Sequence, residues 1–67
     1  MIDSKKTYSK YEIMQLGVLG KTEPTVRKKI LEDLRKENIM QAKVMGEGRE
    51  KRYFVKGENL IKYLEVN

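Results

Sequence analysis

The spacing of the apolar residues changes near residue 39, and this change limits the elements that the chain can form. Before it, Val26, Ile30 and Leu34 recur every four residues and define one stripe of a helix, with Leu31 at the margin. After it, residues 39–45 alternate between apolar and polar, as a half-buried strand does. A helix followed by a strand in so short a chain predicts an α+β fold.

The residues after this strand predict a hairpin and a closing helix. Gly46 and Gly48 supply permissive backbone for a loop of about six residues, and residues 52–56 are rich in aromatic and β-branched types. Gly57 then breaks the second strand, and a last helix is expected over residues 58–65. The side chains expected to face the core are Met40, Ala42 and Val44 from the first strand and Leu60, Ile61 and Leu64 from this helix.

A capping box marks an earlier helix. In Ser9-x-x-Glu12 the serine oxygen accepts from the third helical amide and the glutamate reaches back to the cap. We expect this helix over residues 10–16, with Gly17 as its stop. The side chains expected to pack here are Ile13, Leu16 and Met14, with Tyr8 or Tyr11 at the entry.

The second helix is expected to open at Pro24, with Thr22 or Glu23 as its cap, and to stop at Asn38. A single domain over residues 8–67 then contains two N-terminal helices, a hairpin and a closing helix. Residues 1–7 are polar and are expected to form a flexible N-terminus.

The absence of two residue types, Cys and His, excludes several classes of functional site. The 67 residues include no Cys and no His, which excludes disulfides, thiolate metal sites and the usual general base near neutral pH. A chain of this length also has a thin core and little room to enclose a cleft. We therefore expect no enzyme, no cofactor and no metal. The sequence has neither a membrane-spanning apolar run nor a signal-peptide pattern, so we expect a cytoplasmic protein.

The net charge of +5 favours a polyanionic partner, nucleic acid before an anionic membrane. The positive excess is concentrated in two elements. Residues 21–37 carry six basic against four acidic residues, and residues 43–56 carry five against two. The excess therefore lies in the expected second helix and hairpin and not in a tail.

Several short motifs resemble a known superfamily. Residues 8–18, Tyr-Ser-Lys-Tyr-Glu-Ile-Met-Gln-Leu-Gly-Val, look like the opening of excisionase-type and MerR-type domains, in which a Tyr-Thr/Ser entry caps a helix that ends in Leu-Gly-Val. Residues 25–27, Thr-Val-Arg, match the helix start that follows there. Residues 52–55 and 59–64 are also similar to that branch. The chain thus resembles the winged helix-turn-helix DNA-binding superfamily over about residues 8–66.

A second branch of this superfamily is also similar. The connection from Gly17 to Thr25 is longer than the tight excisionase turn, and so is the second helix. Its ending, residues 34–39, looks more like the recognition helix of small phage and plasmid repressors. Both branches stay open, and with them two roles: transcription regulation, or an accessory function in recombination.

The resemblance implies that the protein binds double-stranded DNA through two elements, and therefore that it is associated with the nucleoid. In this fold the first half of the second helix enters the major groove, and the hairpin, called the wing, lies on the backbone or the minor groove. The implied residues of the helix and its approach are Lys21, Thr22, Thr25, Arg27, Lys28 and Lys29. Those of the wing are Lys43, Arg49, Lys51 and Arg52.

Other interpretations use the same residues. Lys28–Glu32 and Lys29–Asp33 have the spacing of ion pairs on a solvated helix. The acidic residues also suit a protein-interaction module, and structured RNA is a third possible partner. A thin core favours self-association, as a homodimer or a cooperative assembly on DNA. The aromatic residues can stack on bases, but they are spread over separate elements, so we expect them to pack: Tyr8, Tyr11, Tyr53, Tyr63 and Phe54.

Overall fold

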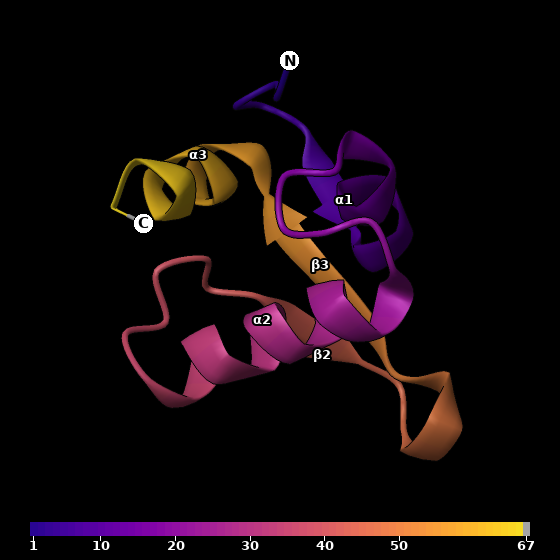
Figure 1. Ribbon diagram of the computed structural model, residues 1–67. Helices are drawn as coiled ribbons and strands as arrows, with labels where there is room; N and C mark the ends of the chain where they lie inside the picture. The colour runs from indigo at the N-terminus through magenta and orange to yellow at the C-terminus, as the bar shows by residue number, and fades with distance from the viewer. Residues whose placement is uncertain (67) are drawn as a thin grey trace.

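A three-stranded antiparallel sheet and three helices form the part of the chain described by the computed structural model, residues 1–66 (Figure 1). The predicted α+β class is confirmed. The last strand lies between the other two, in the order β1-β3-β2. In chain order the elements are β1 (Thr7–Ser9), α1 (Lys10–Leu16), α2 (Glu23–Arg35), β2 (Lys43–Met45), a short 3₁₀ turn η1 (Gly48–Glu50), β3 (Arg52–Lys56) and α3 (Gly57–Val66).

The register of the sheet separates two faces. Tyr8 pairs with Val55, and Val44 pairs with Tyr53, on the inner face that the helices cover. Tyr8, Tyr53 and Val55 are buried in a core completed by Ile13, Leu19, Val26, Ile30, Met40 and Leu60. We call the opposite side of the sheet the outer face. It consists of the alternate residues Thr7, Ser9, Lys43, Met45, Arg52, Phe54 and Lys56.

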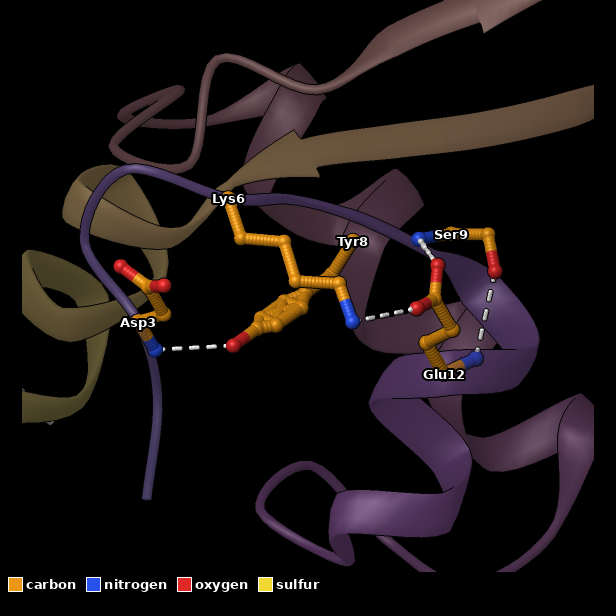
Figure 2. A network of polar contacts seen from close by, with 5 residues as sticks. All are labelled: Asp3, Lys6, Tyr8, Ser9 and Glu12. Atoms are coloured by element: carbon orange, nitrogen blue, oxygen red, sulfur yellow. Dashed lines mark hydrogen bonds and ion pairs between the residues drawn. The ribbon is translucent and has the colours of Figure 1, made fainter.

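Helix α1 begins and ends where the sequence predicts. Ser9 Oγ accepts from the Glu12 amide at 3.2 Å, and Glu12 Oε1 accepts from the Ser9 amide at 3.1 Å, so the capping box is formed (Figure 2). Gly17 ends the helix with a φ of 73°, a left-handed conformation that a residue without a Cβ adopts readily.

The core around α1 differs in part from the expected one. Ile13 is fully buried, and Met14 packs against the core. Leu16, which we expected to be buried, is instead 36% exposed, while Leu19 in the following loop is buried. The loop therefore contributes the apolar side chain that the end of the short helix does not.

Residues 1–7, expected as a flexible terminus, lie against the start of α3. The Lys6 carbonyl accepts from the Gly57 amide at 2.7 Å, and the Ser4 carbonyl accepts from the Glu58 amide at 3.2 Å. A side chain at position 57 would overlap the carbonyl oxygen of Asp3. Glycine at this position therefore lets the two segments approach closely.

The strand β1 was not predicted from the sequence. Its three residues pair with β3 and give the sheet its third strand. Tyr8 fixes the preceding turn because its hydroxyl accepts from the Asp3 amide at 2.8 Å (Figure 2). Lys6 Nζ lies 3.0 Å from Glu12 Oε2, which ties the same segment to α1.

Helix α2 begins as predicted, with Thr22 at the N-cap position and Pro24 in the first turn. The apolar stripe is confirmed, since Val26 and Ile30 are fully buried and Leu34 packs against the core. The helix ends at Arg35, however, earlier than the predicted stop at Asn38.

Asp33 provides the physical reason for this early end. Its carboxylate, only 6% exposed, accepts from the Ile39 amide at 3.0 Å and from the Met40 amide at 2.9 Å. These bonds hold the chain as it turns away from α2. The sequence spacing suggested Lys29 as the partner of Asp33, but both carboxylate oxygens bond to backbone amides instead.

The first hairpin strand is shorter than predicted. It covers only Lys43–Met45 of the expected residues 39–45. Met40 is buried and Ala42 packs against the core, but Val44 is 41% exposed although it pairs with the buried Tyr53, so its expected burial is wrong. The alternation is broken at Gln41, whose φ of 48° is incompatible with an extended strand.

The second half of the chain follows the prediction more closely. Residues 46–51 form the hairpin loop, with φ values of 89° at Gly46 and 63° at Gly48. Strand β3 has the predicted bounds, and α3 extends the predicted helix by one residue at each end. Leu60 is fully buried and Leu64 packs against the core, which confirms that α3 closes it.

Replacing Asp33 with Ala should lower the free energy of unfolding by about 2–4 kcal/mol, because two amides of a partly buried turn lose charged acceptors. Glu32→Ala is the matched control on the exposed side of the same helix and should change stability by less than about 0.5 kcal/mol. Urea denaturation followed by circular dichroism measures both. Equal effects of the two substitutions would contradict the role of Asp33.

Candidate nucleic-acid interface

The predicted helix residues lie on the exposed side of α2 and on its approach. Lys21 and Thr22 precede the helix, and Thr25, Lys28 and Lys29 follow in its first two turns, all of them exposed. Thr22 forms no side-chain cap with the helix. Its hydroxyl instead donates to Thr25 Oγ1 at 2.9 Å. The side of α2 that faces solvent therefore begins with two linked hydroxyls and continues with two ammonium groups.

Arg27 follows the buried Val26 of the apolar stripe and is itself exposed. Its side chain is 49% exposed, and its Nη1 lies 3.7 Å from Glu23 Oε1, one turn earlier. An ion pair this exposed contributes little to stability. The Arg27 guanidinium can therefore leave Glu23 for a stronger anion.

The hairpin loop carries the predicted tip residues. Gly46 and Gly48 adopt left-handed backbone conformations, and the turn η1 follows. Arg49 and Lys51 are exposed on this loop. Glu47 is exposed on the same loop, and the side chain of Glu50 lies outside the part of the chain that the structure describes.

Lys43 and Arg52 occupy a different position from the tip. Both belong to the outer face of the sheet, where Lys43 is paired with Phe54 and Arg52 with Met45. The ten predicted residues therefore form three groups: the exposed side of α2, the tip of the hairpin and the outer face of the sheet.

Lys10 is a residue that the sequence analysis missed. It is 8% exposed, and its Nζ lies 2.7 Å from Glu23 Oε1 and 5.5 Å from the centroid of the Tyr53 ring. A second aromatic ring, that of Tyr11, lies 5.1 Å from the same ammonium. Lys10 thus joins α1, α2 and β3 at one point. Nothing in the sequence distinguishes it from the other lysines, because its partners are distant along the chain.

The hydrogen bond from Lys10 also affects the titration of its partner. It stabilises the Glu23 carboxylate and holds the pKa of that group below its ordinary value, although partial burial opposes the shift. Glu23 is therefore charged near neutral pH and keeps the buried Lys10 ammonium compensated.

A hollow of about 540 Å³ lies between α1 and the hairpin, and we call it the wing hollow. It is lined by Ser9, Lys10, Tyr11, Arg49, Lys51, Arg52, Tyr53 and Phe54. Because Lys10 also contacts Glu23, the start of α2 adjoins this hollow. Figure 1 agrees with this, since the hairpin tip projects from the end of the molecule at which α2 begins.

The aromatic residues divide into two groups. Tyr8 and Tyr53 are buried and Tyr63 packs against the core, which confirms packing as their role. Tyr11 and Phe54 behave differently. Tyr11 is 59% exposed, Phe54 belongs to the outer face, and both line the wing hollow.

Comparison with protein families, with curated proteins and with solved structures found no match to this chain. Within residues 1–66, no helix is both long enough and apolar enough to cross a membrane. Function must therefore be inferred from the geometry and charge of this chain alone.

The Lys10–Glu23 pair predicts a pH dependence. A carboxyl whose pKa is lowered by folding stabilises the folded state above its unfolded pKa of about 4.3, and this contribution is lost as the pH falls through the lower folded value. Glu23→Gln should therefore make the acid-side decrease in melting temperature shallower than in the unmodified protein. Glu37→Gln, on an exposed residue, is the control. Thermal melts between pH 7 and pH 2 test this, and an unchanged slope in Glu23→Gln would rule it out.

Proposed function

We propose that this protein is a winged helix-turn-helix protein that binds double-stranded DNA. In this proposal the first half of α2 enters the major groove, and the loop of residues 46–51 lies over the backbone or the minor groove. The element order helix, helix, hairpin, helix supports it, as does the position of the central strand between two partners.

One observation carries the proposal. The first half of α2 and the hairpin of residues 43–56 are two separate elements with an excess of basic residues, and the hairpin tip projects from the end of the molecule at which α2 begins. The Lys10–Glu23 contact and the wing hollow connect them. A duplex presents a groove flanked by two rows of phosphates, so it can accept a helix and a neighbouring loop together.

Two of the three acidic residues of α2, Glu32 and Asp33, lie at its other end. Both line a hollow of about 280 Å³ near the last turn of the helix, together with Lys36, Glu37, Ile39 and Tyr63. The pKa of Tyr63 is raised by burial and by these two carboxylates of α2. Residues 23–29 of α2 carry three basic residues against one acidic, whereas residues 30–35 carry one basic against two acidic. The charge along α2 therefore favours contact with phosphates through its first half.

The biological role follows from which DNA is bound. A transcription regulator and a recombination accessory factor both need the surface described above and differ in target. Selection of preferred sites from random duplexes separates the two, because it reports the target sequence directly.

Replacing Lys28 and Lys29 together with Ala should weaken binding to a selected duplex by at least about tenfold, since two groove-facing cations are lost. Arg49→Ala should reduce affinity for all duplexes more evenly, because a loop on the backbone carries little sequence information. Lys62→Ala, an exposed lysine of α3, is the control. Electrophoretic mobility shifts measure each. Unchanged mobility for the α2 and loop variants would remove this surface from the proposal.

Salt should oppose binding strongly. Each phosphate contact lowers the logarithm of affinity by about 0.9 for each unit of log salt concentration. A titration against random duplex DNA, starting near about 50 mM salt, measures this slope. Failure to bind even there would favour a protein-interaction module with the same fold, and preference for duplex RNA in direct competition would favour an RNA partner.

A further inference from the structure

A second hollow, of about 480 Å³, lies on the outer face of the sheet, and we call it the strand hollow. Lys43, Met45, Phe54 and Lys56 are among the residues that line it. Phe54 also lines the wing hollow. The two hollows therefore share Phe54, and we call them together the outer groove.

Strand alternation explains how the groove forms. Ser9 and Lys43 are the cross-strand partners of Phe54 on its two sides, so all three side chains stand on the same face. Arg52 and Lys56 lie two residues before and after Phe54 along β3, about 6.6 Å away in each direction. Phe54 is thus the centre of an open sheet face with cations on three sides.

The described charged side chains that line the outer groove are all basic. Five of its lining residues are exposed cations: Lys43, Arg49, Lys51, Arg52 and Lys56. A sixth, Lys10, is buried and is compensated by Glu23. Among the side chains that the structure describes, no Asp or Glu lines either hollow. Such a surface attracts an extended polyanion.

Apolar side chains accompany these cations. Tyr11 and Met45 are 59% and 54% exposed, and Phe54 is half-buried between them in the groove. Exposed aromatic rings among cations are what a single strand of nucleic acid requires, because its phosphates follow the charge while its bases stack on the rings. A duplex cannot use the rings in this way, since its bases are already stacked inside.

We propose that the outer groove binds single-stranded nucleic acid, with one base stacked on Phe54, a neighbouring base on Tyr11, and the backbone along the exposed cations. The side chains of Phe54 and Lys56 take no part in the duplex contact proposed for α2. The groove shares Lys43, Arg49, Lys51 and Arg52 with the wing, but stacking on Phe54 and Tyr11 is a separate activity that does not depend on duplex binding.

Two substitutions at Phe54 test the stacking. Phe54→Tyr keeps an aromatic ring, whereas Phe54→Leu keeps an apolar side chain without one. A labelled 12-nucleotide thymidine oligomer, titrated at low salt and followed by fluorescence anisotropy, should bind Phe54→Leu about tenfold or more weakly than the unmodified protein. It should bind Phe54→Tyr about equally well. Lys56→Ala should weaken binding and reduce its salt dependence.

Controls separate this site from the duplex surface. The double variant Lys28→Ala with Lys29→Ala should bind the oligomer normally, and Phe54→Leu should bind duplex DNA normally. Thermal melts of each variant verify folding. If Phe54→Leu is unfolded, Lys56→Ala and the double variant at α2 provide the test. The proposal then requires that Lys56→Ala weakens binding of the oligomer and that the α2 double variant does not.

Three results would overturn the proposal. One is failure of the oligomer to bind the unmodified protein. Another is equal loss of oligomer binding in the α2 double variant and in Lys56→Ala, which would assign single strands to the duplex surface. The third is normal oligomer binding by Phe54→Leu. If a labelled peptide of alternating Glu and Phe also displaces the oligomer and tolerates Leu at position 54, the groove binds an acidic protein segment instead.

Discussion

The alternation of β3 determines both the core and the surface of this protein. The strand is paired on both sides, and Tyr53 and Val55 are buried while Phe54 faces outward. A slip of one residue in the register would turn Arg52 and Lys56 toward the core, where an unpaired charge is strongly destabilising. Burial of two side chains therefore fixes the orientation of their neighbours. The hydrophobic core and the outer groove are consequences of one pairing.

The parts of the fold that could be predicted from the sequence are those set by local interactions. Ser9 and Glu12 form a capping box within one turn, and Gly17 ends the helix through its own backbone conformation. Pro24 likewise acts at the first turn of α2. In each of these signals the interacting residues are close together in the chain, so a short stretch of sequence is enough to recognise the interaction. The α+β class followed from the same local patterns.

The features that escaped prediction depend on partners far away in the chain. Thr7 was expected in a flexible terminus, and Tyr8 and Ser9 at the entry and cap of a helix, yet residues 7–9 form a strand because they pair with the edge of β3. Gly57 looks like a simple break, yet its missing side chain admits the backbone of residue 3. Alternation over residues 39–45 predicted a long strand, but the buried Asp33 holds the chain in a turn at its start. In each case tertiary contacts outweigh local propensity.

Long-range contacts also decide which cations are available at the surface. Lys10 follows a helix cap and resembles any solvated lysine in the sequence, yet it is buried against Glu23 and two rings. Its charge is compensated by that carboxylate and little of the side chain is exposed, so its main contribution is to hold α1, α2 and β3 together. Arg27 shares the same carboxylate at a longer distance and remains half exposed. Glu23 thus contacts two cations that differ in role: Lys10 is buried and structural, whereas Arg27 is exposed and can bind a phosphate.

The basic residues of the hairpin are close together in the sequence, but their side chains lie on different surfaces of the protein. Arg49 and Lys51 lie on the loop, whereas Lys43 and Lys56 stand on the outer face and line the strand hollow with Asn59 at the start of α3. A duplex held by α2 and the loop would neutralise the first pair and leave the second pair in solvent. Like charges near one another repel, and here no described acidic side chain in the groove offsets them. That uncompensated charge beside Phe54 is what a second polyanion, bound separately from the duplex, would neutralise.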